Sequence, residues 1–559
     1  MAMTRTGADL FVEAAEQYGV TRLFGNPGTT ELPIMEAIGD SSLEYVLGLH
    51  EDVAVGMAAG YAKTRAYHAR EDPAVTPVGL VNLHVAPGLA HGLGNVFDSS
   101  LVGTGAPLVV TAGNHPTDHQ HHEPNLGGDL VEMADQFTKW SAEVPTAAAL
   151  PTMLRRAFRV AMTPPTGPVF LSLPIDVMLA ETDARPERLG TVPDGGLGDP
   201  EQVAAAADHV ASAEEVVLVV GDGVARSGGD AVDSAVRFAE ATGARVHGEL
   251  KASEVSFPTA HEQWAGGLPR SQQATADLLD VDTVVFAGVV SMTPTNPPEV
   301  DLLSESTTTV FVSDHAWELG KNEVSDVGIL GDPGRCLDQV AEATDLDAAT
   351  VAARLDRVAA VREAQSGGPA ETRTDDPRAS ATELATAMHA AAPDARVVVE
   401  APTTTGVLYD AWEFEWGDFF KNRGGGLGWS LPAAIGSAVA EAETDDPRDV
   451  LAFVGDGSYL YYSNAIYSAA RYGVDLTAVV ADNRNYRILK DNALRIMGGT
   501  EEEYDFVGMD FDPPVDIPTT ARGHGASASL VEDPDAIEGA VREAVAESGP
   551  TVLDVLIHD

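Results

Sequence analysis

Short apolar runs alternate with helix-like segments along almost the whole chain. Each apolar run spans four to seven residues and ends close to Gly, Asn, Asp, His or Pro, while the segments between them repeat apolar positions every three to four residues. In the first such segment, Leu10, Phe11, Ala14 and Tyr18 share one face and should point inward. Strands that alternate with helices are typical of parallel α/β sheets.

The runs fall into three groups, each of which predicts one sheet. The predicted strands lie in TRLFGNPG, LEYVLGL, PVGLVNLH, APLVVTAGN and GPVFLSLP of the first group, in EEVVLVVGDG, GARVHGEL, DTVVFAGVV and TTTVFVSD of the second, and in ARVVVEAP, DVLAFVGDG, LTAVVADN and PTVLDVLI of the third. We therefore predict an α/β protein with three domains, at residues 1–185, 195–345 and 379–559. A chain of 559 residues is also too long for one ordinary core.

The segment 346–378 is predicted to link the second and third domains. Its end, QSGGPAETRTDDPR at 365–378, is rich in Gly, Pro and charge. Directly after it, Ser380 and Glu383 have the spacing of a capping box, which predicts the start of a helix.

The chain is strongly acidic, with 86 Asp and Glu against 34 Lys and Arg, a net charge of −52. The acidic residues are scattered, so their repulsion is best screened in molar salt, where the Debye length is ~3 Å. This pattern favours adaptation to a high-salt cytoplasm. The alternative, a nucleic-acid mimic or a protein that binds a basic partner, predicts one concentrated acidic face. The absence of a basic patch argues against nucleic-acid binding.

Two further classes are disfavoured by composition. Apolar runs such as 284–290 are far too short to cross a membrane, and the N-terminus lacks an apolar signal core, so we expect a soluble, cytoplasmic protein. The single cysteine, Cys336, excludes internal disulfides and cysteine-rich metal sites, and we expect it to pack inside a helix that follows GDPGR.

The clearest chemical signal lies between 451 and 487, in LAFVGDGSYLYYSNAIYSAARYGVDLTAVVADNRNYR. Two apolar strands flank a helix that ends at Gly473, so Asp456 and Asn483 should meet at the carboxyl ends of neighbouring parallel strands. Hard oxygen donors beside glycine amides suit Mg²⁺ shared with a diphosphate. The alternative is that GDG is only a tight turn and Asn483 only a turn or cap residue. The pairing of Asp456 with Asn483 at this spacing disfavours that interpretation.

GDGS followed by Asn483 resembles the diphosphate-binding motif of thiamine diphosphate enzymes. The resemblance implies that Asp456, Asn483 and the carbonyl of Asn485 hold Mg²⁺. It also implies that Leu427 supports the cofactor in a bent shape. Further cofactor contacts are implied for Thr403, Gly455, Gly457, Ser458 and Tyr486.

In the first domain, GLHEDVAVGMAAGYA places Glu51 after a strand and before a helix rich in small residues. The resemblance implies that this carboxylate, contributed by the partner subunit, shares a proton with the aminopyrimidine of the cofactor. Taken alone, Glu51 would be interpreted as a charge stabilised by a helix dipole. Because Glu51 and Asp456 meet between subunits in this family, a homodimer or homotetramer is implied.

The resemblance narrows to benzoylformate decarboxylase and its relatives through FGNPGTTELP, VNLHVAPGLAHGLGN and GGLGWSLPAAIG. It implies that His84 handles protons beside the cofactor, and that Thr29 contacts the substrate carboxylate where relatives carry serine. One departure stands out. The region 287–300 contains no counterpart of the family's second catalytic histidine. His115, His119, His121 and His122, in one loop, are the candidates to replace it; the alternative is a solvated loop, and their spacing fits no familiar zinc pattern.

The predicted function is therefore the non-oxidative decarboxylation of a 2-oxo acid with thiamine diphosphate and Mg²⁺. Joining of the bound enamine to an aldehyde is a further reaction open to this protein. The alternative enzyme is an acetolactate synthase-like carboligase acting on pyruvate. FAD is not expected, because 287–300 carries no convincing FAD pattern. A nicotinamide-dependent dehydrogenase is disfavoured, because the second GDG, in VVGDGVARSGG, lacks the full dinucleotide fingerprint. A non-catalytic cofactor-binding regulator is the third hypothesis, and it would have no need of Glu51.

The substrate itself stays open. Residues near Thr29, Tyr459, Leu460 and Leu489 are expected to shape the pocket. A crowded pocket would favour pyruvate-like acids, and a roomy one aryl or branched acids.

Overall fold

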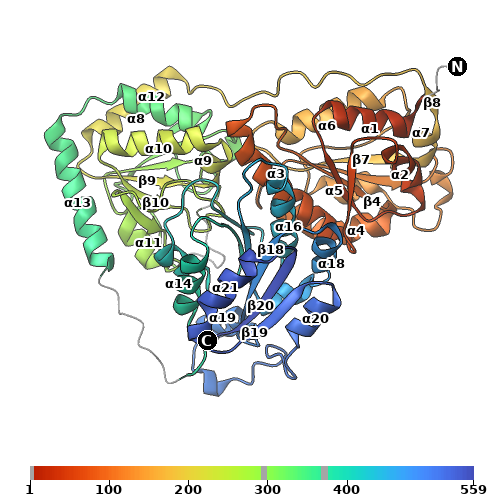
Figure 1. The fold of residues 1–559 in the computed structure, drawn as a ribbon. Coiled ribbons are helices and arrows are strands. Elements are labelled where there is room, and N and C mark those ends of the chain that lie inside the picture. Colours follow the sequence, from red (N-terminus) through yellow and green to blue (C-terminus); the bar gives the residue numbers. More distant parts are fainter. Residues whose placement is uncertain (1–4, 291, 293–298, 367–375, 559) are drawn as a thin grey trace.

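The computed structural model describes residues 5–290, 292, 299–366 and 376–558. Three sheets of six strands each carry helices on their faces and form three lobes of one molecule (Figure 1). Every strand pair within these sheets is parallel. The predicted α/β class and its three parallel sheets are confirmed.

The first sheet has the strand order β3-β2-β4-β5-β7-β6. Neighbouring strand residues such as Leu23 and Phe24 belong to separate cores on opposite faces, because successive side chains of a strand alternate. Its strands are β2 (Arg22–Gly25), β3 (Glu44–Leu47), β4 (Gly79–Leu83), β5 (Leu108–Asn114), β6 (Ser141–Glu143) and β7 (Val169–Pro174), with the short antiparallel pair β1 (Arg5–Thr6) and β8 (Glu181–Thr182) beside them. Its helices are α1 (Gly7–Gln17), η1 (Thr29–Glu31), α2 (Leu32–Ile38), α3 (Glu51–Glu71), α4 (Val85–Asp98), η2 (Gln120–His122), α5 (Leu130–Asp135), α6 (Leu150–Met162) and α7 (Ile175–Leu179).

The middle sheet has the order β11-β10-β9-β12-β13-β14. Cys336 is fully buried on α12, as expected. The strands are β9 (Val216–Val220), β10 (Arg245–Gly248), β11 (Trp264–Gly267), β12 (Thr283–Ala287), β13 (Thr308–Ser313) and β14 (Val327–Leu330). The helices are α8 (Pro200–Ser212), α9 (Asp222–Arg226), α10 (Gly229–Thr242), α11 (Gln272–Leu279), η3 (Ala316–Glu318), α12 (Pro333–Ala343) and α13 (Ala348–Ser366).

The third sheet has the order β16-β15-β17-β18-β20-β19. The predicted capping box of Ser380 and Glu383 begins α14. The strands are β15 (Arg396–Glu400), β16 (Phe419–Lys421), β17 (Val450–Gly455), β18 (Leu476–Asp482), β19 (Ser527–Val531) and β20 (Pro550–Leu556). The helices are α14 (Ala381–Ala391), α15 (Thr405–Ala411), α16 (Ser430–Glu441), α17 (Asp456–Tyr461), α18 (Ala465–Tyr472), α19 (Arg487–Met497), η4 (Glu501–Glu503), α20 (Ile517–Gly523), η5 (Pro534–Ala536) and α21 (Ile537–Ala546).

Helices α3 and α16 hold the first and third domains together (Figure 1). Both helices are almost entirely buried, and both are rich in small residues, which allow their backbones to approach closely. A Cβ at Gly60 would lie 1.8 Å from the carbonyl oxygen of Ala433, and one at Gly436 would lie 1.8 Å from that of Met57. The two backbones therefore touch, and this contact sets the position of Glu51 at the first turn of α3.

The predicted linker, 346–378, contains an ordered helix, α13. Arg354 of this helix is buried and donates hydrogen bonds to the carbonyl oxygens of Thr242, Val210 and Ala213, at 2.6 to 2.8 Å. The helix is thus attached to the middle domain (Figure 1). The exact domain boundaries stay predictions. Among the described residues, no helix is long and apolar enough to cross a membrane.

Candidate active site

A cavity lies at the carboxyl edge of the third sheet, where the neighbouring strands β17 and β18 end. Gly455 pairs with Ala481 in register, so the residues that follow these strands lie side by side. All the residues predicted to bind the cofactor or its metal line this one cavity, namely Thr403, Leu427, Gly455, Asp456, Gly457, Ser458, Asn483, Asn485 and Tyr486. The sequence pattern predicted this grouping because parallel strands place their carboxyl ends at one edge.

Backbone conformation shapes the cavity at two points. A Cβ at Gly457 would lie 2.6 Å from the ring of Tyr486, so only glycine fits beneath that ring. Arg484 has a φ of 62°, in the left-handed region that non-glycine residues rarely adopt. Its N–H donates to Asp482 Oδ1 at 2.8 Å, and this turn separates Asn483 from Asn485. Strained residues of this kind concentrate at functional sites.

Asp456 is the first residue of α17 and is 4% exposed. Its Oδ1 accepts the N–H of Gly457 at 2.8 Å, whereas Oδ2 is buried and meets no hydrogen-bond donor in the described part of the chain. Burial and the neighbouring Asp482 carboxyl raise the pKa of Asp456 to about 8, and the same causes raise the pKa of Asp554 to about 7. The carboxylates of Asp456, Asp482 and Asp554 crowd together, and the Arg484 guanidinium lies beside them, with Nε 3.9 Å from Asp482 Oδ2. Such oxygen donors fit a hard divalent cation, and the glycines of the motif leave room for a diphosphate.

Glu51 stands at the start of α3 and is 8% exposed. His91 of α4 approaches it, with Nδ1 3.4 Å from Glu51 Oε2, and the His50 and His91 rings stack 5.3 Å apart. Among the described His, Cys, Asp and Glu side chains, these three form the one group of three or more whose donor atoms are close enough to share a metal ion. However, His50 Nδ1 accepts the N–H of Asp52, so Nε2 carries the hydrogen and cannot ligate without giving up this cap. We interpret the group as a hydrogen-bonding environment for the carboxylate.

His84 precedes α4 at the end of β4. Its Nδ1 lies 2.8 Å from Oε2 of the fully buried Glu31 and 3.2 Å from Thr30 Oγ1. A carboxylate only accepts, so Nδ1 carries the hydrogen and Nε2 is left to exchange a proton elsewhere. Val85 beside it has a φ of 30°, a strained value for a β-branched residue.

Glu31 was not among the predicted site residues, although it lies within the FGNPGTTELP segment at 24–33. Thr29, the predicted substrate contact, is exposed on η1, and it is Thr30 that contacts His84. The sequence signal for Glu31 was a carboxylate two positions after Thr29, the predicted substrate contact. Without coordinates, nothing indicated that it turns back toward the histidine.

Within one chain, the two halves of the predicted site are separate, since none of Glu51, His84 and Thr29 lines the third-domain cavity. His119, His121 and His122 are exposed, with the last two rings 3.9 Å apart, and His115 is half-buried. Tyr459 is buried in the core and Leu489 is exposed. Within 287–300, the region that lacks the family's second catalytic histidine, residues 291 and 293–298 lie outside the described residues.

Models of known protein families match parts of all three domains. The models for the N-terminal TPP binding domain, the central domain and the C-terminal TPP binding domain of thiamine pyrophosphate enzymes match residues 5–138, 203–340 and 414–555. A benzoylformate decarboxylase of Pseudomonas aeruginosa is 31% identical over 549 residues, which cover 97% of each chain.

Two further similarities extend over the whole chain. An acetolactate synthase large subunit of Parasynechococcus marenigrum is 25% identical and covers 99% of this chain and 88% of its own. The crystal structure of benzoylformate decarboxylase from Polynucleobacter necessarius is similar with a TM-score of 0.87 at 26% identity, over 99% of both chains.

Proposed function

The chain belongs to the thiamine pyrophosphate enzyme family, and we propose that it decarboxylates a 2-oxo acid without oxidation, with Mg²⁺ and thiamine diphosphate as cofactors. The observation that carries this proposal is the pairing of His84 with the buried Glu31. A decarboxylase needs such a group, because the substrate carbon that loses CO₂ must take up a proton. Similarity to benzoylformate decarboxylases along the full length supports the same reaction.

In this proposal the third domain holds the cofactor by its diphosphate. Asp456, Asn483 and the carbonyl oxygen of Asn485 would hold Mg²⁺, while Gly457 and Ser458 would contact the diphosphate. Leu427, in the same cavity, would support the cofactor between its two rings. When bound, thiamine diphosphate supplies the electron sink for breaking the bond to the carboxylate.

The first domain would supply the proton chemistry. The Glu51 carboxyl group would exchange a proton with the aminopyrimidine ring, and His91 beside it would orient the carboxylate. His84 Nε2 would exchange a proton with the substrate, while Glu31 holds its Nδ1–H. The hydroxyl of Thr29 would contact the substrate carboxylate. None of His115, His119, His121 and His122 is assigned a role within one chain.

We propose further that the complete site forms between two subunits, because Glu51 and Asp456 do not share a cavity in one chain. A homodimer is the smallest assembly that completes it, and two such dimers would give a tetramer. The cytoplasmic location and the adaptation to high salt stay predictions from the sequence.

The test is a panel of 2-oxo acids, namely benzoylformate, pyruvate, 2-oxoisovalerate and phenylpyruvate, in molar KCl with Mg²⁺ and thiamine diphosphate. Aldehyde and CO₂ in equal amounts, lost in Glu51→Gln, are the expected result. Acetolactate from pyruvate would support the second candidate, a carboligase, which the similarity to an acetolactate synthase favours. A cofactor that binds without any turnover of these acids would contradict both.

A further inference from the structure

The second GDG of the chain, Gly221-Asp222-Gly223, stands at the end of β9, where an open α/β sheet would bind a ligand. Its glycines serve close packing. A Cβ at Gly221 would lie 2.4 Å from the Cα of Val289, and one at Gly223 would lie 2.7 Å from the Cα of Gly288. These glycines therefore let the loop after β12 cross over the motif, and they leave no cradle for phosphate at this point.

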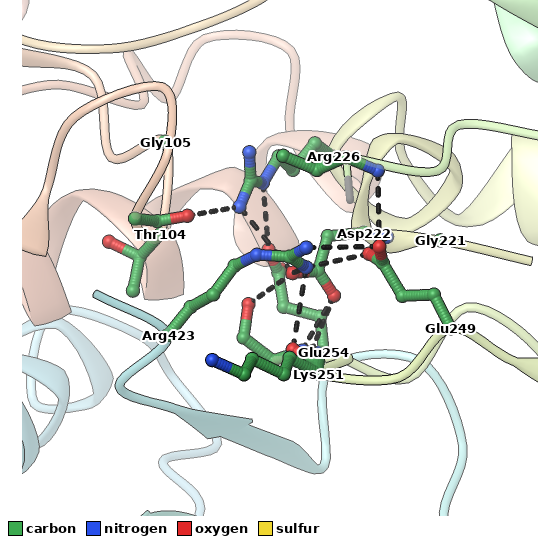
Figure 2. A network of polar contacts seen from close by, with 12 residues as sticks. Thr104, Gly105, Gly221, Asp222, Arg226, Glu249, Lys251, Glu254 and Arg423 are labelled. Carbon is green, nitrogen blue, oxygen red and sulfur yellow. Dashed lines mark hydrogen bonds and ion pairs between the residues drawn. The ribbon is translucent and has the colours of Figure 1, made fainter. Parts of the chain in front are cut away.

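The carboxylate of this motif binds an arginine from the third domain (Figure 2). Arg423 Nη1 lies 2.6 Å from Asp222 Oδ2 and 2.6 Å from Glu249 Oε1, and Nη2 lies 3.0 Å from Glu249 Oε2. The Arg423 side chain is 3% exposed, and both carboxylates are fully buried. Burial would raise the pKa of Asp222, but Arg423 and Arg226 outweigh it and lower the pKa to about 2.

The motif is fixed independently of Arg423. Ser253 donates to Asp222 through its N–H at 2.7 Å and its hydroxyl at 2.5 Å. Arg226 donates to the carbonyl oxygen of Gly103 at 2.7 Å, and Lys63 of α3 pairs with Glu254 at 2.6 Å. All three domains thus meet around one buried carboxylate, so the position of Arg423 is determined by groups outside its own domain.

Arg423 begins the segment 423–430, which carries Leu427 into the cofactor cavity. Asp98 of the first domain lies beneath this segment, where a Cβ at Gly424 or Gly426 would lie 2.1 or 2.4 Å from its carboxylate oxygens. At the far end, Glu400 accepts the N–H of Gly428 at 2.5 Å and that of Ser430 at 2.8 Å. Leu427 therefore lies in a segment that is held at its start by the ion pairs of Arg423 and at its end by the hydrogen bonds to Glu400.

We propose that Arg423 is a positioning residue for the cofactor. Its ion pairs with Asp222 and Glu249, here called the clasp, set the backbone path of 423–430 and so the position of Leu427. The inference rests on the proposed function of the third-domain cavity. It also explains why the chain keeps a GDG in the middle domain: the carboxylate holds an arginine of the neighbouring domain rather than a metal or a nucleotide.

A double-mutant cycle tests this path. The full chain is titrated calorimetrically with thiamine diphosphate in excess Mg²⁺, as wild type, Arg423→Lys, Leu427→Ala and the double variant. Lysine keeps the charge but loses the planar fork, so we expect the dissociation constant of Arg423→Lys to rise about tenfold. If Arg423 acts through Leu427, the same change should have less than about a twofold effect in the Leu427→Ala background.

Arg237→Lys is the matched control, because Arg237 makes an exposed ion pair with Asp338 within the middle domain. It should leave the dissociation constant unchanged. Equal fold-changes for Arg423→Lys in both backgrounds would show a merely structural role and overturn the inference. Should Arg423→Lys not fold, Asp222→Asn loosens the same clasp from the other side and must give the same non-additivity. Failure of the proposed decarboxylation would appear in the turnover assay and leave this binding cycle intact.

Discussion

A carboxylate at the first turn of a helix, as in Glu51, is commonly a charge that favours the helix dipole, and its chemistry depends on its neighbours. Here the neighbours are His50 and His91, whose rings stack 5.3 Å apart. If Glu51 exchanges a proton with the cofactor, replacement by the isosteric amide must stop the reaction without disturbing the helix.

We expect Glu51→Gln to lower kcat about 10²- to 10⁴-fold while thiamine diphosphate still binds within a few-fold of wild type. The measurement pairs steady-state turnover with calorimetric titration of the cofactor. Glu71→Gln, at the exposed last residue of the same helix, should leave both quantities unchanged. A variant at position 51 with near-wild-type turnover would remove Glu51 from the proposed proton path.

For single residues, the sequence predicted which ones lie together at the ends of neighbouring strands. It did not predict which side chains on the loops contact one another. Asp456 and Asn483 could be paired because their positions depend only on the order of two parallel strands. The contact of Glu31 with His84 and the clasp of Arg423 by Asp222 depend on how loops turn back, and no periodic pattern encodes this.

Individual elements show the same division. The thirteen predicted strands are all present, and all of them except the edge strand β3 are largely buried. The missed strands of the three sheets are β6, β11, β14, β16 and β19, and every one of them lies at a sheet edge. Edge strands are short and partly solvated, so sequences such as SAE and SASLV lack the continuous apolar run that identifies a central parallel strand.

The contact of α3 with α16 gives a prediction about helix packing. Alanine usually stabilises a helix relative to glycine, but a Cβ at Gly436 would lie 1.8 Å from the carbonyl oxygen of Met57. The helices must separate to accept it, so we expect Gly436→Ala to cost about 3 kcal/mol, measured as a lower urea midpoint. Gly539→Ala on α21, where a Cβ would meet nothing within 4 Å, is the control and should be neutral or slightly stabilising.

The pairing of β10 with β11 gives a prediction about pH. His247 is fully buried and its Nδ1–H donates to the carbonyl oxygen of Gly266 at 3.0 Å, and burial lowers the pKa of His247 to about 4. Between this value and the ordinary pKa of about 6.5, the unfolded chain binds a proton that the folded chain excludes. Stability should therefore fall as the pH falls through this range, by up to about 3 kcal/mol.

His247→Gln keeps an amide donor and has no such titration. The difference between the urea midpoints of variant and wild type should move in favour of the variant as the pH is lowered from about 7 to about 4.5. This comparison cancels the many carboxylates that both proteins share. A difference independent of pH would show that His247 is protonated in the folded protein.

On the scale of the whole molecule, the net charge of −52 makes stability depend on salt. Screening shortens the range of repulsion between exposed carboxylates, so the melting temperature should rise steeply from about 0.1 M to about 2 M KCl. Sucrose at equal osmolality controls for the general effect of an excluded solute. An equal rise in sucrose would mean that charge repulsion contributes little, against the proposed adaptation to high salt.

The division of the site between two subunits allows a test by complementation. Glu51→Gln and Asp456→Asn should each be inactive alone, because each homodimer lacks the same group in both sites. In a heterodimer of the two variants, one site combines both defects, whereas the other takes an intact Glu51 from one subunit and an intact Asp456 from its partner. Doubly tagged heterodimers from co-expression should therefore recover about half of the wild-type turnover per dimer. If both residues acted within one chain, every site of the heterodimer would carry one defect and no activity would return. The same preparation controls for misfolding, because a variant that rescues its partner must itself be folded.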